Sequence, residues 1–446
     1  MNADGWRARL APFVQVGLMS GVAGVVLVLQ DALLASRFST GIAVDVYQLA
    51  ISVPQTALNV FAGGTLLAVL VPRLAQAQLD GRTSVPALLA IVRRRLGVLL
   101  AGLSMLWLLL FPLVASALRR ADPPGTTELG WRLLVCLSPV LVLTGLTGVD
   151  AAVLNSRRRF GLISLLPLFN PLGVVLLVFL AAGRIGIYAA ALGLTAGSVA
   201  QWLLLRAVVG RAGDAIGTAG PPSREVLAGL DRQYLTAAAS AALLGGIPLT
   251  DTFVASTLAP GSTATLGYAS RPVILLLAFA TTTVGNVLLP HVSHLAARGE
   301  LAAVRRQFLT WSAVLLAASV PAVAVWWFFA PDLVRLLYER GAFTAQETVR
   351  VAAAQRLYVL QMPVYLVAMV GWRVMNSLQR HGTLLAITAT AFLANLGIDT
   401  WLAPRMGLAG VIWGTIVAFT LWGGLTVSSL LRHGRPPAGA PQGLGS

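Results

Sequence analysis

The chain has 446 residues, of which 57% are hydrophobic and only 11% charged, and its mean hydropathy is +0.81. Soluble globular proteins do not have this composition, so the sequence predicts an all-α polytopic membrane protein. The net charge of +16 does not indicate a nucleic-acid partner, because the arginines are scattered and lie mostly at the ends of apolar segments.

Apolar windows as long as a membrane span, ~20 residues, recur along the chain. We expect about twelve transmembrane helices from this length rule, with boundaries uncertain by several residues. The windows are 12–30, 45–72, 96–118, 132–154, 161–182, 186–206, 234–258, 268–290, 308–330, 351–374, 383–402 and 407–431.

Arginines mark every second connection between these windows. If the N-terminus is in the cytoplasm, most of them fall in cytoplasmic segments, as the positive-inside rule requires. An even number of spans then places both termini in the cytoplasm. The polar, Pro- and Gly-rich end, residues 433–446, is predicted to be a disordered cytoplasmic tail.

The two halves of the chain resemble each other. The segment Asp31-Ala-Leu-Leu-Ala-Ser matches Asp251-Thr-Phe-Val-Ala-Ser, and VLNSRRRFG (153–161) matches VMNSLQRHG (374–382). The offset of about 220 residues predicts a parallel repeat of two six-helix lobes, whose interface is the usual place for a substrate site. We expect these lobes at residues 1–215 and 225–432.

The window 383–402 contains Asn395 and Asp399, one helical turn apart and therefore on one face. A carboxylate inside a membrane helix costs ~2.5–3.5 kcal/mol on insertion scales, so it is expected to have a function. The alternative is an aspartate near the helix end that faces interfacial water or pairs with Arg405.

The short connection 402–407 predicts a tight antiparallel hairpin centred near Arg405. In that register Asp399 lies level with Val411, and Asn395 lies level with Thr415. Asp251 is expected at a similar depth in its own span. Together with the Val411 carbonyl, these groups form an all-oxygen ligand set that suits a hard cation or a proton rather than zinc or iron.

Three blocks of the chain, 29–76, 249–293 and 333–358, resemble the MurJ/MviN family of lipid II flippases. The third block contains Arg340-Gly341-Ala342-Phe343, which is similar to the "RG-F" connection of that family. The resemblance implies the fold of the multidrug/oligosaccharidyl-lipid/polysaccharide exporter (MOP) superfamily, which is MATE-like, with two six-helix lobes around a central cavity.

The resemblance also implies site residues. It implies a sodium site at Asp251, Asn395, Asp399, Val411 and Thr415, with a proton as the alternative coupling ion. The substrate-binding positions that it implies are Arg271, Asp31, Asp45, Asn59 and Gln30. Gln30 and Asn59 depart from the family, because the family has arginines at these positions. Gly24 also stands where the family has an arginine. Arg37, Arg356 or Arg373 are candidates to replace them, and the alternative for Arg356 and Arg373 is a membrane anchor.

The sequence therefore predicts a transporter and not an enzyme. The first hypothesis is a cation-coupled flippase that moves a polyprenyl-pyrophosphate-linked, lipid II-like precursor outward by alternating access. The alternative is a MATE-like exporter of a small molecule, which the missing arginines favour. We expect a monomer in the bacterial cytoplasmic membrane, in contact with lipids and its lipid-linked substrate, and without a nucleic-acid partner.

Overall fold

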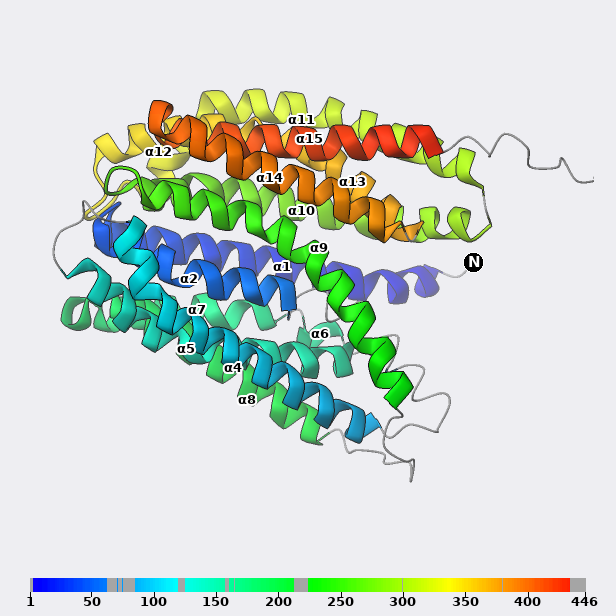
Figure 1. The fold of residues 1–446 in the computed structure, drawn as a ribbon, viewed down its shortest axis with the longest axis horizontal. Helices are drawn as coiled ribbons and strands as arrows, with labels where there is room; N and C mark the ends of the chain where they lie inside the picture. Colours follow the sequence, from blue (N-terminus) through cyan, green and yellow to red (C-terminus); the bar gives the residue numbers. More distant parts are fainter. Residues whose placement is uncertain are drawn as a thin grey trace, which may run out of the picture. The chain divides into compact units, whose positions relative to one another are not determined.

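The computed structural model is all-helical in the residues that it describes, which are 3–61, 70, 74, 85–118, 125–156, 160–163, 165–211, 224–298, 300–378 and 380–433. Helices are the expected form of long apolar segments, because a helix satisfies its backbone hydrogen bonds internally where no water is present. The helices are α1 (Ala3–Phe38), α2 (Ile42–Phe61), α4 (Val85–Leu118), α5 (Thr126–Ser156), α6 (Phe160–Ile163), α7 (Leu166–Ile185), α8 (Tyr188–Arg211), α9 (Arg224–Ser256), α10 (Ser262–Ala297), α11 (Leu301–Tyr338), α12 (Ala345–Val359), α13 (Met362–Ser377), α14 (His381–Met406) and α15 (Leu408–His433) (Figure 1).

Ten helices of the described chain are long and apolar enough to cross a membrane, or eleven spans if α12 and α13 count as one. These eleven coincide with eleven of the expected windows. The remaining window, 45–72, begins in α2 and continues into residues outside the described part. The prediction of an all-α polytopic membrane protein is confirmed.

The expected span 351–374 is broken rather than continuous. Helices α12 and α13 are bent by 44° at their junction. Pro363 lies in the first turn of α13 and has no backbone N–H to bond back to the end of α12. The proline therefore explains why one apolar window becomes two helices.

The described chain forms two compact units. Unit 1 comprises Met1–Tyr268 and Leu333–Arg350, and unit 2 comprises Ala269–Asp332 and Val351–Ser446. The chain crosses between them within α10, α11 and α12. The N-terminal ends of α10 and α12 and the C-terminal end of α11 thus belong to unit 1, although most of each helix belongs to unit 2. The predicted six-helix lobes are a division by sequence repeat and stay a prediction.

Unit 1 is held together by helix pairs with close backbones. In the pair α7–α8, a Cβ added at Gly193 would lie 2.6 Å from Val174 Cα on the facing helix. A Cβ added at Gly197 would lie 2.8 Å from Asn170 Cα. Small residues at such positions let membrane helices pack by van der Waals contact. A buried apolar cluster, which includes Leu88, Leu100, Val149 and Leu154, joins α4 to α5.

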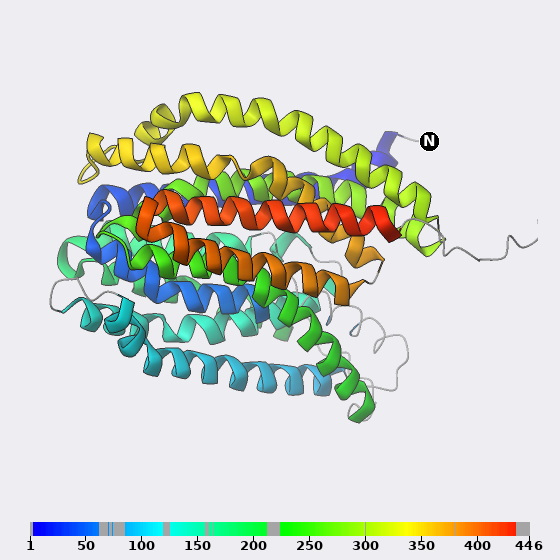
Figure 2. The same ribbon diagram turned by 45° about the horizontal axis from the view of Figure 1, so that its top comes forward.

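Unit 2 contains the hairpin α14–α15, whose helices run antiparallel and side by side (Figures 1 and 2). Helix α13 packs on α15 through an aromatic cluster. The ring of Tyr365 lies edge-on to Phe419 at 4.9 Å, and Phe419 lies 6.0 Å from Trp422. Trp422 is fully buried, so the cluster anchors the hairpin α14–α15 to α13.

Large apolar side chains are also exposed, mainly along α4, α7 and α11. On α4 the exposed ones include Val98, Met105, Leu106, Leu109 and Leu113. A water-soluble protein does not expose apolar surface of this extent, whereas a membrane-spanning helix presents it to lipid.

Candidate functional site

The candidate ion site lies on the hairpin α14–α15. Helix α14 continues through Arg405 to Met406, and Gly407 alone connects it to α15. Gly407 has φ +61°, a left-handed conformation that glycine adopts without strain, and its N–H bonds to Ala403 O at 2.9 Å. Helix α7 ends in the same way at Gly186, with φ +60° and a bond to Ala182 O. The two glycines lie at the offset of about 220 residues expected from the parallel repeat.

The candidate ligands on this hairpin are buried. Asn395 and Asp399 have 0% exposure, as does Val411, and Thr415 has 2%. The alternative interpretation, in which Asp399 faces interfacial water or pairs with Arg405, is therefore wrong. Arg405 donates to Trp401 O and stacks on the Trp401 ring at 4.7 Å.

The register of the hairpin differs from the expected one. A Cβ added at Gly414 would overlap Asp399 Oδ1, and one added at Gly410 would lie 2.6 Å from Leu402 C. Asp399 therefore faces Gly414, next to Thr415, instead of Val411. The physical reason is that α14 extends to Met406, immediately before Gly407. The centre of the turn therefore lies after Arg405, which is the centre expected from the sequence. The absent side chain at Gly414 provides the space that the Asp399 carboxylate occupies.

Thr415 and Val411 are linked on α15. The Thr415 hydroxyl donates to Val411 O at 3.2 Å. A hydroxyl that donates its hydrogen to a backbone carbonyl directs its lone pairs elsewhere, which is the arrangement that a cation ligand needs. Unit 2 thus places a carboxylate and a hydroxyl at adjacent levels, with an amide one turn away. Within the described residues no group of three or more His, Cys, Asp or Glu could hold a metal ion, so any cation here would rely on neutral oxygens as well.

Asp251, the remaining predicted ligand, lies on α9 in unit 1. Its side chain is 3% exposed. Pro248 precedes it in the helix, and Thr252 donates to the Pro248 carbonyl at 2.8 Å. The carboxylate is therefore buried, and its part in a shared ion site stays a prediction.

The predicted substrate residues of unit 1 are also buried. Gln30 is 8% exposed, Asp31 3% and Asp45 1%. Asp45 has a defined structural role, because its Oδ2 accepts the N–H of Gly261 at 2.6 Å and its Oδ1 accepts the N–H of Ala264 at 2.7 Å. These contacts cap the N-terminus of α10, where backbone N–H groups favour a negative charge.

The remaining candidates are distributed between the units. Asn59 is in α2, and its side chain lies outside the described part of the structure. Arg271 is in α10, is half-buried, and belongs to unit 2. A shared substrate site of Arg271 with Gln30, Asp31 and Asp45 stays a prediction.

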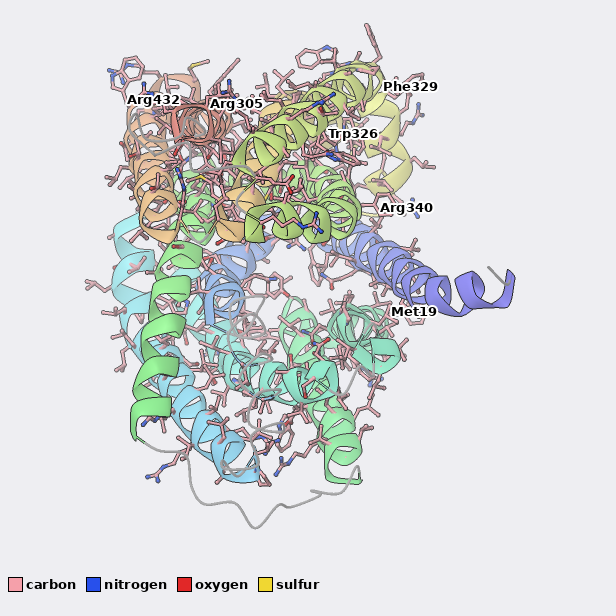
Figure 3. All side chains as sticks on the ribbon, turned by 90° about the vertical axis from the view of Figure 1, so that its right-hand side faces the viewer. Met19, Arg305, Trp326, Phe329, Arg340 and Arg432 are labelled. Atoms are coloured by element: carbon pink, nitrogen blue, oxygen red, sulfur yellow. The ribbon has the colours of Figure 1, made fainter. Side chains whose placement is uncertain are left out.

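The candidate replacement arginines differ in their surroundings. Arg37 is exposed, and the Nε of the half-buried Arg356 donates to Trp327 O at 2.9 Å. Arg373 instead lines a small pocket with Thr281, Leu315 and Met369. A second small pocket includes Arg305 and Arg380. Arg305 and Arg432, which are labelled in Figure 3, lie in segments of unit 2 that are expected to face the cytoplasm.

An ion pair between α4 and α5 was not expected from the sequence. Arg93 Nε donates to Asp150 Oδ1 at 3.1 Å, and a second guanidinium nitrogen also contacts this oxygen. The Asp150 side chain is only 1% exposed. The sequence signal was a lone acid in an apolar window, but nothing local indicates which of three consecutive arginines is its partner.

The first turn of α12 contains another residue that sequence reasoning missed. Glu347 Oε2 accepts the N–H of Thr344 at 2.6 Å and its hydroxyl at 3.0 Å. Glu347 Oε1 accepts the N–H of Thr40 at 3.1 Å, the Thr40 hydroxyl at 2.7 Å, and the Ser39 hydroxyl. The spacing Thr344-x-x-Glu347 is a capping-box signal. It predicts the contacts of Glu347 with Thr344 but not those with Ser39 and Thr40.

The comparisons with known proteins decide the family. The family model for lipid II flippase MurJ matches residues 34–435. The chain belongs to the lipid II flippase MurJ family. It is a multi-pass membrane protein of a transporter family and not of an enzyme family, as the sequence predicted.

Individual relatives agree with this assignment. A probable lipid II flippase MurJ of Rhizobium tropici is 25% identical over 411 residues, which cover 87% of this chain and 74% of the relative. Another, of Synechocystis sp., is 26% identical over 432 residues, covering 92% and 78%.

Solved structures establish the fold. A lipid II flippase MurJ in an inward closed conformation has a TM-score of 0.79 at 19% identity, over 94% of this chain and 87% of that one. An outward-facing MATE multidrug transporter of the MOP superfamily has a TM-score of 0.60 at 17% identity, over 94% and 96%. The predicted MOP-type fold is confirmed.

Proposed function

We propose that this MurJ family member moves lipid II, or a closely similar polyprenyl-pyrophosphate-linked precursor, from the inner to the outer leaflet of the bacterial cytoplasmic membrane. The observation that carries the proposal is the family match over residues 34–435. In this proposal the chain acts as a monomer with both termini in the cytoplasm, and the two sequence-repeat lobes, 1–215 and 225–432, alternate access to the two sides.

The proposed coupling ion is sodium, bound by Asp399, Asn395, Thr415 and the Val411 carbonyl, with Asp251 as a further ligand. Support comes from the complete burial of Asn395 and Asp399 and from the space at Gly414. A bound cation or a proton offsets the cost of burying a carboxylate charge inside a protein. Inward movement of one charge supplies ~2.3 kcal/mol per 100 mV of membrane potential, which can reset the transporter.

Arg271 is proposed to contact the pyrophosphate, because it is the family arginine that this chain retains. Guanidinium groups bind phosphate oxygens bidentately. Arg373 is a second candidate, since it is half-buried and lines a pocket, whereas the Arg356 guanidinium is bonded to a backbone carbonyl. Asp31, Asp45, Gln30 and Asn59 are proposed to shape the rest of the substrate site.

The second candidate function is export of a small molecule, as in MATE transporters. The observation that favours it is the replacement of family arginines by Gly24, Gln30 and Asn59, which reduces the positive charge available to a diphosphate. The similarity to a MATE structure at a TM-score of 0.60 is compatible with it.

Reconstitution distinguishes the two functions. Purified protein in liposomes with labelled lipid II in the inner leaflet should increase the rate at which the label reaches the outer leaflet, and a sodium gradient should alter that rate. An Asp399→Asn variant controls for leakage. Flipping no faster than in protein-free liposomes, together with transport of small cationic dyes, would overturn the lipid II proposal in favour of the second function.

A further inference from the structure

Glu347 joins two segments that are far apart in the chain. Its Oε2 completes the capping box of α12 with Thr344, while its Oε1 receives Thr40 N–H, Thr40 Oγ1 and Ser39 Oγ from the turn after α1. One carboxylate therefore serves two purposes, one local to α12 and one between distant segments. The two functions can be separated by mutation because they use different oxygens.

Further contacts strengthen this connection. Ala342 N–H donates to Ser36 O at 2.8 Å, and the Tyr268 hydroxyl donates to Ser39 O at 3.2 Å. The ring of Tyr338 lies 5.2 Å from Tyr268 and 5.9 Å from Phe343. We call the hydrogen-bonded part of this contact the clasp: Ser36, Ser39 and Thr40 on one side, with Ala342, Thr344 and Glu347 on the other.

Backbone geometry indicates that the clasp constrains the chain. Ser39 has φ +55°, which is unfavourable for a residue with a side chain. Gly341 has φ +62°, and a Cβ at this position would collide with the Ser36 carbonyl. The turn after α1 and the connection before α12 are thus fitted to each other closely, and the clasp maintains a conformation that Ser39 does not favour by itself.

The clasp lies where the chain crosses between the two units. Leu333–Arg350 belongs to unit 1, whereas the part of α11 before Leu333 and the part of α12 after Arg350 belong to unit 2. If the units move relative to each other, the helices must bend at these crossings or the clasp must open. At the left of Figure 1 the end of α1 and the start of α12 lie at one end of the molecule, which the arginine distribution assigns to the cell exterior.

We propose that Glu347 is a latch of the transport cycle: its Oε1 holds the exterior end of α12 against the turn after α1, and release of Ser39 and Thr40 accompanies opening of that end. The inference rests on the proposed alternating-access function. The latch contacts form only in the closed state. They therefore stabilise that state relative to the open one and set the ratio of closed to open molecules.

The test measures a distance within unit 1 in purified, full-length protein. Spin labels are placed at Arg37→Cys and Val349→Cys in a Cys136→Ser background. Arg37 is exposed, Val349 is 69% exposed, and Cys136 is the single cysteine. Double electron–electron resonance then gives the distance distribution in nanodiscs without substrate. The measured distance distribution does not depend on which substrate the protein transports. The experiment can therefore contradict the latch without contradicting the proposed function.

Glu347→Gln and Thr40→Val are the latch variants. Each should raise the ratio of long to short distances about tenfold, as expected for loss of one charge-assisted hydrogen bond. Glu339→Gln is the matched control, because Glu339 contacts Thr348 and Arg335 of its own segment. Thr344→Ala removes the hydroxyl of the capping box only, and it should retain the wild-type distribution.

Two results would overturn the proposal. The first is a wild-type distribution in both Glu347→Gln and Thr40→Val. The second is an equal shift in Thr344→Ala, which would assign the effect to capping of α12. Thr40→Val keeps the side-chain shape and leaves the capping box intact, so it remains informative if Glu347→Gln does not fold.

Discussion

Glu347 Oε1 accepts hydrogen bonds from both the backbone N–H and the hydroxyl of Thr40, a residue 307 positions earlier in the chain. This contact joins the turn after α1 to the first turn of α12, and it is part of the reason that Leu333–Arg350 belongs to unit 1. The "RG-F" connection thus has a structural explanation, in which Gly341 permits close approach to Ser36 and Phe343 fills an aromatic cluster.

The first prediction concerns the coupling ion. Sodium chloride should raise the melting temperature of the purified wild-type protein in a saturable manner, and potassium chloride at equal ionic strength should not, because ligand binding to the folded state stabilises it. Asp399→Asn should abolish the difference. Equal melting curves in the two salts at several pH values would exclude sodium and favour the proton.

The second prediction concerns the space beside Asp399. Gly414→Ala should displace the carboxylate and remove the sodium-dependent rise in melting temperature, with an overpacking cost of about 1–3 kcal/mol. Gly424→Ala is the matched control on the same helix, because a Cβ at Gly424 meets no atom within 4 Å. If both variants keep the sodium response, Gly414 has no part in the ion site.

The third prediction concerns the ion pair between α4 and α5. Arg93→Ala should destabilise the protein by about 3 kcal/mol, because it leaves the buried Asp150 carboxylate without its arginine. Arg94→Ala, at the neighbouring exposed position, should have little effect. The double variant Arg93→Met/Asp150→Leu should recover much of the loss in thermal unfolding measurements, and failure to recover would mean that the charges themselves are needed.

The fourth prediction concerns the retained family arginine. Arg271→Ala should abolish lipid II flipping while leaving expression unchanged, and Arg271→Lys should restore it only in part, because lysine cannot bind a phosphate bidentately. Arg356→Ala serves as the control, since the Arg356 guanidinium is bonded to Trp327 O. Wild-type flipping by Arg271→Ala would remove this residue from substrate binding.

The fifth prediction concerns the absent arginines. The chain should complement depletion of an essential lipid II flippase poorly, because a diphosphate meets less positive charge. The combined substitutions Gly24→Arg, Gln30→Arg and Asn59→Arg should improve growth in the depletion strain, and the same positions changed to glutamine should not. Full complementation by the unmodified chain would show that these arginines are not required.

The sequence by itself determined the membrane class, the helical fold and most span positions, because hydropathy and helix length are local properties. It also located the turn between α14 and α15, the pair Asn395 and Asp399, and the blocks that resemble the MurJ family. The capping box at Thr344 and Glu347 was equally readable, since capping depends on residues three positions apart.

Only the tertiary structure decided which distant groups meet. It showed that Asp399 faces Gly414, that Arg93 rather than its neighbours contacts Asp150, and that Glu347 Oε1 reaches Thr40. The physical reason is that helix register and side-chain partners depend on packing between segments, and a shift of a single residue rotates a helix by about 100°. Hydropathy places a helix in the membrane but does not fix that rotation, so the partners of buried charges follow from the packing of the whole chain.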